Sequence, residues 1–110
     1  MGSGEQPSLA EAMNRLWVQY LPQIEERVRA LELAAEALES GCLTQEQCAQ
    51  ATAAAHKLAG VLGTFGLPDG TLLAREAEAF YAAGPSTHIS PDGRPAELAS
   101  QLRAMLATRK

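Results

Sequence analysis

The N-terminal third of the chain carries an apolar stripe at helical spacing, and this stripe constrains the fold more than any other feature. Its members follow one another in steps of three and four residues, which holds them on one face of a helix for about eight turns. They are Leu9, Met13, Leu16, Tyr20, Ile24, Val28, Leu31, Ala35 and Leu38. A stripe this long needs other helices to cover it, so the sequence predicts a helical bundle.

Ser8 and Gly41 mark the two ends of this first segment. Ser8 is a plausible N-cap because Glu11 follows three residues later, and Gly41 is expected to stop the helix. Pro22 interrupts the segment, since proline lacks the backbone donor and clashes with the preceding turn. The stripe keeps its phase across Pro22, so we expect either one kinked helix or two helices that meet near Leu21.

Three shorter helical segments follow. The first is predicted to run from residue 45 to about Leu62 or Thr64, the second over residues 68–82 and the third over residues 95–108. Thr44 and Gln47 form the pattern of a capping box before the first of these, and Pro68 suits the first turn of the second. Residues 84–95 contain Gly-Pro and Asp-Gly pairs, which are typical of turns. No stretch alternates with a period of two, so the predicted fold is an all-α, antiparallel four-helix bundle over residues 8–109.

The apolar positions of the three shorter helices are expected to complete the core. These positions are Cys48, Ala51, Ala55, Leu58 and Leu62, then Leu72, Leu73, Ala77 and Phe80, and finally Leu98, Leu102, Met105 and Leu106. Residues 1–7 are predicted to be a flexible leader outside the fold, of a kind that cloning also leaves behind.

Composition narrows the classes of function. The chain has 110 residues and a formal net charge of −4, which fits one domain and argues against nucleic acid as a partner. No apolar run approaches the roughly 20 residues that span a bilayer, and no secretory signal is evident, so we expect a cytoplasmic protein with no membrane partner. Cys42 and Cys48 form neither a CxxC pair nor a zinc quartet, and they are expected to be reduced thiols.

His56 lies on the flank of the second predicted helix, about 120° from the centre of its core stripe at roughly 100° per residue. The residues that share its face are all small, and they are Thr52, Ala53, Ala59, Gly60 and Gly63. Small residues around an exposed imidazole leave room for a partner to dock closely. The open alternative is that another helix packs tightly on these positions and leaves His56 at the rim.

The segment from His56 to Leu67, with the sequence HKLAGVLGTFGL, resembles the signature of histidine phosphotransfer domains. That signature is a histidine followed by leucine two, glycine four and glycine ten residues later, often with a glycine at seven. The positions that match are Leu58, Gly60, Gly63 and Gly66. Glu78 lies where members of the family carry Glu or Gln, and the resemblance extends over most of residues 8–109.

The resemblance implies a carrier in phosphorelay signal transduction. His56 would accept a phosphoryl group and exchange it with the aspartate of a response-regulator receiver domain, which would hold Mg²⁺. An upstream histidine kinase or hybrid kinase is the second expected partner, and the chain itself is expected to bind no cofactor and to be no ATP-using kinase. Glu78 is the candidate that orients the imidazole. The family's usual lysine is Ala59 here, so Lys57 is the candidate for charge support.

Other interpretations of these residues stay open at this point. Glu78 is also placed to form an ion pair with Arg75 on its own helix. His88 lies in the predicted loop and is expected to be exposed, and no metal site is expected from it with His56 and Glu78. The alternative function is a helical module that binds a receiver or another signalling partner without phosphotransfer. A hydrolase is disfavoured, since no serine or cysteine is arranged as its nucleophile.

Overall fold

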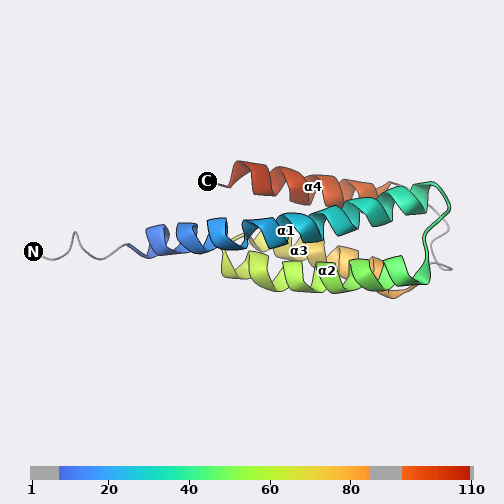
Figure 1. The fold of residues 1–110 in the computed structure, drawn as a ribbon, viewed down its shortest axis with the longest axis horizontal. Coiled ribbons are helices and arrows are strands. Elements are labelled where there is room, and N and C mark those ends of the chain that lie inside the picture. Colours follow the sequence, from blue (N-terminus) through green and yellow to red (C-terminus); the bar gives the residue numbers. More distant parts are fainter. Residues whose placement is uncertain (1–7, 85–92, 110) are drawn as a thin grey trace, which may run out of the picture.

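A computed structural model describes residues 8–84 and 93–109, and within these ranges the chain forms four helices and no strand. Figure 1 shows the helices as a bundle in which consecutive helices run in opposite directions. The four are α1 (Leu9–Glu39), α2 (Gln45–Thr64), α3 (Pro68–Ala82) and α4 (Arg94–Thr108). The predicted all-α class and bundle architecture are confirmed. The predicted leader, residues 1–7, lies outside the described residues.

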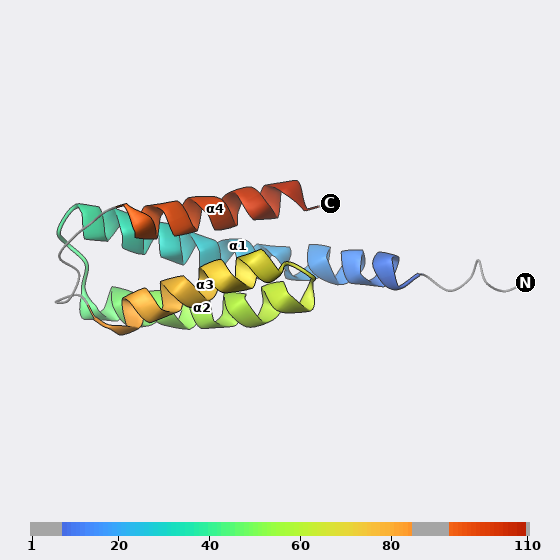
Figure 2. The same ribbon diagram turned by 180° about the vertical axis from the view of Figure 1, so that it is seen from behind.

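The four helices are arranged so that each packs chiefly on two others. α1 packs on α2 and α4, and α3 packs on α2 and α4, with the most extensive contact between α2 and α3. Seen from behind, α3 lies along α2 and nearer the viewer than α1 (Figure 2). A cyclic arrangement of this kind buries one face of every helix, as in other antiparallel bundles.

α1 is one helix of 31 residues, so the predicted split near Leu21 does not occur. Ser8 and Glu11 form the expected capping box at its start. Pro22 lies inside the helix on its exposed side. The carbonyl of Val18 loses its usual donor there, but Val18 is itself on the exposed side, where water can replace the missing hydrogen bond.

Glycines in the left-handed conformation end both α1 and α2. Gly41 has φ +73° and Gly66 has φ +76°, and each directly follows the C-cap residue of its helix. In both turns the amide two residues beyond the cap bonds back into the last turn of the helix, as from Cys42 to the Ala37 carbonyl (2.8 Å). This is the Schellman arrangement, and it reverses the chain within a few residues.

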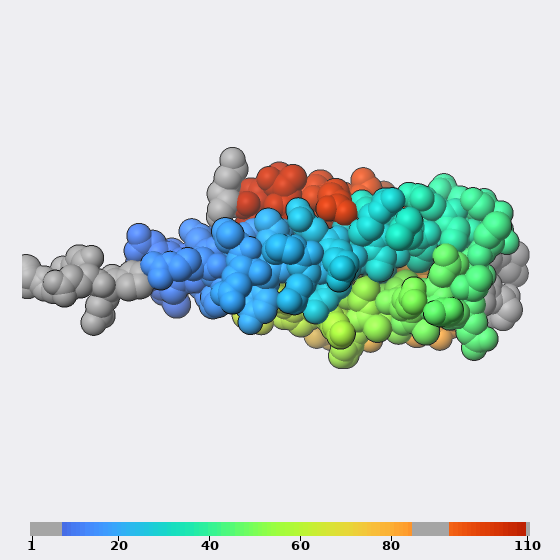
Figure 3. Space-filling view, in the orientation of Figure 1, coloured from blue at the N-terminus to red at the C-terminus, as the bar shows by residue number. Residues whose placement is uncertain are grey.

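The core confirms most of the predicted stripe but not its beginning. Ile24, Val28 and Leu31 are buried, whereas Leu9 is 79% exposed. Leu16 and Tyr20, also predicted in the core, are exposed too. α1 is longer than its partners, so its first turns project beyond the bundle (Figures 1 and 3), although Met13 still packs against the edge of the core.

The bundle closes instead on Trp17, one residue away from the predicted stripe. Trp17 is buried, and its ring meets Phe65 edge to face with 5.3 Å between the ring centroids. The Arg109 guanidinium lies 4.6 Å from the centroid of the Trp17 ring. The contact between the two rings joins α1 to the end of α2, and the Arg109 guanidinium adds a cation–π contact to the Trp17 ring.

The predicted core face of α3 is confirmed at Ala77 and wrong at Leu72. Leu72 is 66% exposed, and the buried residues are Gly70, Ala74, Ala77 and Tyr81. Small residues face the core here because α3 lies close to its neighbours. A Cβ atom on Gly70 would lie 2.8 Å from Met105 Sδ and 2.9 Å from Leu62 Cδ1. The larger Leu73 and Phe80 therefore pack at the edge of the core.

We expect opposite effects from alanine at two glycines of the His56 segment. Gly66→Ala should lower the free energy of unfolding by about 1–2 kcal/mol, because alanine is strained at positive φ. Gly60→Ala should raise it by up to about 1 kcal/mol, because a Cβ there meets no atom within 4 Å and alanine favours the helix. Urea denaturation measures both. Equal losses in the two variants would contradict this assignment.

Candidate functional site

His56 lies near the middle of α2 and points away from the core stripe of that helix. Its side chain is 75% exposed, although the preceding residue Ala55 and Leu58 are fully buried. The prediction of an imidazole on the flank of the helix is therefore confirmed. Nothing in the packing requires a histidine at this position, which leaves its chemistry as the reason for the ring.

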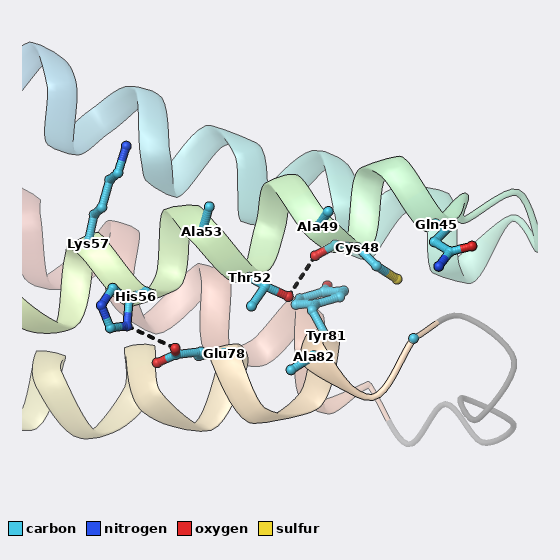
Figure 4. A pocket seen from close by; sticks show the side chains of 11 residues that line it. Gln45, Cys48, Ala49, Thr52, Ala53, His56, Lys57, Glu78, Tyr81 and Ala82 are labelled. Carbon is cyan, nitrogen blue, oxygen red and sulfur yellow. Dashed lines mark hydrogen bonds and ion pairs between the residues drawn. The ribbon is translucent and has the colours of Figure 1, made fainter.

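Glu78 on α3 holds one nitrogen of the His56 ring. Nδ1 of His56 and Oε2 of Glu78 are 2.9 Å apart, and the Glu78 side chain is 31% exposed. With the ring neutral, Nδ1–H donates to the carboxylate, and the lone pair of Nε2 stays available (Figure 4). The alternative pair with Arg75 does not form among the described residues, where Glu78 contacts His56 instead.

A shallow groove of about 540 Å³ runs from His56 along α2 and α3. Figure 4 shows the side chains that line it, with His56 and Glu78 at one end. The other lining residues are Gln45, Cys48, Ala49, Thr52, Ala53, Lys57, Tyr81, Ala82 and Gly84. Most of these side chains are small or apolar. The groove therefore offers a partner a largely apolar surface beside the imidazole, with charged side chains only at the end where His56 lies.

Two titratable groups of the groove stay neutral. Burial raises the pKa of the Tyr81 phenol to about 12, with a smaller contribution from Cys48. Burial also raises the pKa of the Cys48 thiol. Both groups are protonated at neutral pH, so the charged groups that line the groove are Glu78 and Lys57, together with His56 when its ring is protonated.

The predicted docking face is only partly assembled. Ala53 and Gly60 are exposed, and Thr52 is half-buried, with its hydroxyl bonded to the Cys48 carbonyl at 2.7 Å. Ala59 is 6% exposed and belongs to the hydrophobic core, so it adds little to an exposed surface. Its predicted place in the docking face is therefore wrong. Both interpretations of the small residues thus hold in part. Some of these residues face solvent, where a partner can dock, and others allow α3 to pack closely on α2.

Gly63 and Lys57 also differ from a simple exposed face around His56. A Cβ on Gly63 would lie 3.2 Å from the Thr71 hydroxyl of α3, so this glycine borders a helix contact. The Lys57 side chain points away from His56, towards α1 (Figure 4). The predicted role in charge support would require the ammonium group of Lys57 to lie near the imidazole, and in the structure it does not.

No group of three or more His, Cys, Asp or Glu side chains in the described part of the chain is placed to hold a metal ion. His88, which was considered as a metal ligand with His56 and Glu78, lies outside the described residues. No described helix is both long and apolar enough to cross a membrane.

Comparison with known proteins decides the family. The sequence profile of the Hpt domain matches residues 15–109. The chain belongs to the Hpt domain family. Hpt domains are phosphorelay carriers of two-component signalling rather than kinases, and they work with receiver domains and kinases. The family predicted from the His56 segment is therefore confirmed.

A curated relative of this Hpt domain is much longer than the chain. Protein RcaC of Microchaete diplosiphon is 33% identical to it over 93 residues, which are 84% of the chain and 14% of RcaC. The chain thus corresponds to about a seventh of that protein. No solved structure matches the Hpt domain described above.

The sequence missed the part of the groove that lies towards the start of α2. Ala49 and Gln45 are one and two turns further from His56 than Thr52, and Tyr81 and Ala82 face them from α3. The signal was present in the spacing of Ala74, Ala77 and Tyr81, which repeats at three and four residues. It was outweighed by the greater hydrophobicity of the leucines beside it.

The ring of His56 should be held in one tautomer. We expect the neutral imidazole to carry its proton on Nδ1, because the Glu78 carboxylate accepts that hydrogen bond. Nitrogen chemical shifts of the ring measure this directly. Glu78→Gln should keep the tautomer, since its amide oxygen still accepts, and Glu78→Ala should lose it. Glu76→Gln, which alters a carboxylate bonded to Arg94 instead, is the control. Unchanged shifts in Glu78→Ala would contradict the assignment.

Proposed function

We propose that His56 is the phosphoacceptor of this Hpt domain and that it exchanges the phosphoryl group with an aspartate of a receiver domain. One observation supports this most strongly: an exposed imidazole whose Nδ1 is bound by a carboxylate at 2.9 Å, so that Nε2 is the free nucleophile. Enzymatic nucleophiles are commonly paired and oriented in this way by a neighbouring group.

The transfer step balances without a proton leaving the ring. Nε2 of His56 forms a bond to phosphorus while the bond from phosphorus to the aspartate oxygen breaks, and that oxygen leaves as a carboxylate. The ring keeps its proton on Nδ1 and gains positive charge, which the Glu78 carboxylate stabilises at hydrogen-bonding distance. The reverse step returns the phosphoryl group to an aspartate, as a carrier requires.

The partner is expected to supply what this chain lacks. Phosphoryl transfer depends on positioning and on neutralising the charge of the phosphoryl oxygens. Lys57 points away from the ring, and Glu78 is itself negative. We therefore assign the Mg²⁺ and the aspartate to the receiver domain and the original phosphorylation to a histidine kinase or hybrid kinase, with no cofactor on this chain.

The surface around His56 suits the approach of a receiver. Ala53 and Gly60 are exposed and have short or no side chains, so the imidazole stands above its surroundings on α2. A side chain on Gly60 would meet no atom of this chain within 4 Å, which leaves that space to a partner. The groove beyond Thr52 extends the same surface away from Gly60.

We expect His56→Gln to fold normally and to accept no phosphoryl group from a phosphorylated receiver. The exposed ring contributes little to packing, so its loss should change the free energy of unfolding by less than about 0.5 kcal/mol. The measurement is incorporation of acid-labile, alkali-stable label, with His88→Gln as the matched control that should be labelled like the parent. Full labelling of His56→Gln would contradict the proposal.

The same experiment separates a carrier from a binding module. A receiver complex without label on the parent chain would mean that this bundle binds its partner but does not take part in transfer. Loss of label in His56→Gln, with the complex retained, would support the carrier.

The direction of Lys57 predicts a small role in the stability of phosphohistidine. Lys57→Ala should change the lifetime of the phosphorylated chain by less than about twofold, since exposed charges that do not touch interact weakly. The decay of label at neutral pH measures this. A lifetime shortened severalfold would show that the flexible lysine stem turns back to the phosphoryl group.

A further inference from the structure

A hydrogen bond between α2 and α3 lies away from the His56 ring. The Thr71 hydroxyl donates to the backbone carbonyl of Ala59 at 2.9 Å, and Thr71 is half-buried. Within α2 that carbonyl already faces the amide of Gly63, four residues on. A carbonyl oxygen has two lone pairs, so it can accept from both donors.

Gly63 provides the space for this bond. A Cβ at position 63 would lie 3.2 Å from the Thr71 hydroxyl oxygen, closer than ordinary contacts of a methyl group allow. A side chain at position 63 would crowd the Thr71 hydroxyl, which would have to shift by a few tenths of an ångström to make room. The glycine and the threonine therefore form one contact between the two helices.

This contact and the site share one register. His56 and Gly63 are seven residues apart on α2, and Glu78 and Thr71 are seven apart on α3. Seven residues are close to two helical turns, so each pair lies on one face, about 10 Å apart along the axis. Because the helices are antiparallel, Gly63 faces Thr71 in the same register in which His56 faces Glu78.

The beginning of α3 has no side-chain cap and is held by tertiary contacts, among them the close packing of Gly70 against α2 and α4. Its N-cap residue, Leu67, forms no side-chain capping hydrogen bond, unlike the N-cap residues of α1 and α2. A slide of α3 by one residue relative to α2 would move Glu78 by about 1.5 Å and, if the helix rotated with it, by 100°. Either movement would take the carboxylate off Nδ1 of His56.

We propose that Thr71 is a positioning residue for phosphotransfer: its hydrogen bond to the Ala59 carbonyl, in the space left by Gly63, holds α3 in the register that keeps Glu78 on His56. The role in transfer rests on the proposed function of His56. The role in orienting the ring does not, because the contact between Glu78 and His56 exists before any phosphoryl group arrives.

The first experiment removes only the hydroxyl of Thr71. Thr71→Val keeps the branched shape, and we expect it to lower the rate of transfer from a phosphorylated receiver by about three- to tenfold, the range that loss of one hydrogen bond allows. Thr71→Ser keeps the hydroxyl and should stay within about twofold of the parent. Thr64→Val is the matched control, because the Thr64 hydroxyl bonds to the Gly60 carbonyl within α2 alone (3.1 Å).

A double-mutant cycle with Glu78→Ala shows whether Thr71 acts through Glu78. If it does, Thr71→Val should have little effect on the rate once Glu78 is gone, and the two changes should not add. Nitrogen shifts of the His56 ring provide a readout without phosphate, and they should move towards those of Glu78→Ala in Thr71→Val but not in Thr71→Ser. Gly63→Ala should move the shifts in the same direction while the bundle stays helical.

The outcomes separate the two claims. Full additivity of Thr71→Val with Glu78→Ala, or ring shifts that are unchanged in both Thr71→Val and Gly63→Ala, would overturn the positioning role. If the parent chain takes no label, the proposed phosphoacceptor function fails, and the ring shifts alone still decide whether Thr71 positions Glu78. Circular dichroism of each variant verifies that the four helices remain.

Discussion

The distance between α2 and α3 is set by residues that have almost no side chain. Gly70 leaves no room for a Cβ against Leu62 and Met105, and Gly63 leaves just enough space for the Thr71 hydroxyl. Helices that approach this closely can exchange hydrogen bonds between short side chains, as Thr71 does with Ala59. The contact between His56 and Glu78 spans the same pair of helices, with 2.9 Å between Nδ1 and Oε2.

This close packing also explains the chemistry of the groove. Tyr81 and Cys48 are buried where α3 meets the start of α2, and burial keeps both protonated. The carboxylate of Glu78 is the charged group that contacts the imidazole, which favours a ring that is fixed in orientation and open at Nε2. Charge for the phosphoryl oxygens has to come from elsewhere, which is why the proposal gives that task to the partner.

Local signals in the sequence were sufficient to predict the ends of the helices. Capping boxes at Ser8 and Thr44 and the glycine at position 41 act through hydrogen bonds to residues a few positions away, so no knowledge of tertiary contacts was needed. The exposed position of His56 could also be predicted from the sequence, because it follows from the phase of the apolar residues along α2. Glu78 came from the family resemblance, and the structure brings it to the ring.

The spacing of apolar residues along the sequence did not predict features that depend on tertiary packing. Leu9 continues the stripe of α1 perfectly well, but it is exposed because α1 extends beyond the other described helices at this end. Leu72 is more hydrophobic than Ala74, yet α3 turns the alanine inward, on the face where Gly70 approaches the neighbouring helices closely. The direction of Lys57 likewise depends on the space beside α1, which no pattern along α2 records.

The central claim is that phosphorus bonds to one particular nitrogen of one particular histidine. The most direct measurement is phosphorus–nitrogen coupling by NMR on the nitrogen-labelled chain after phosphorylation by a receiver. The account predicts coupling to Nε2 of His56, with Nδ1 still protonated beside Glu78. Phosphorus on Nδ1 of His56, or on His88, would contradict it.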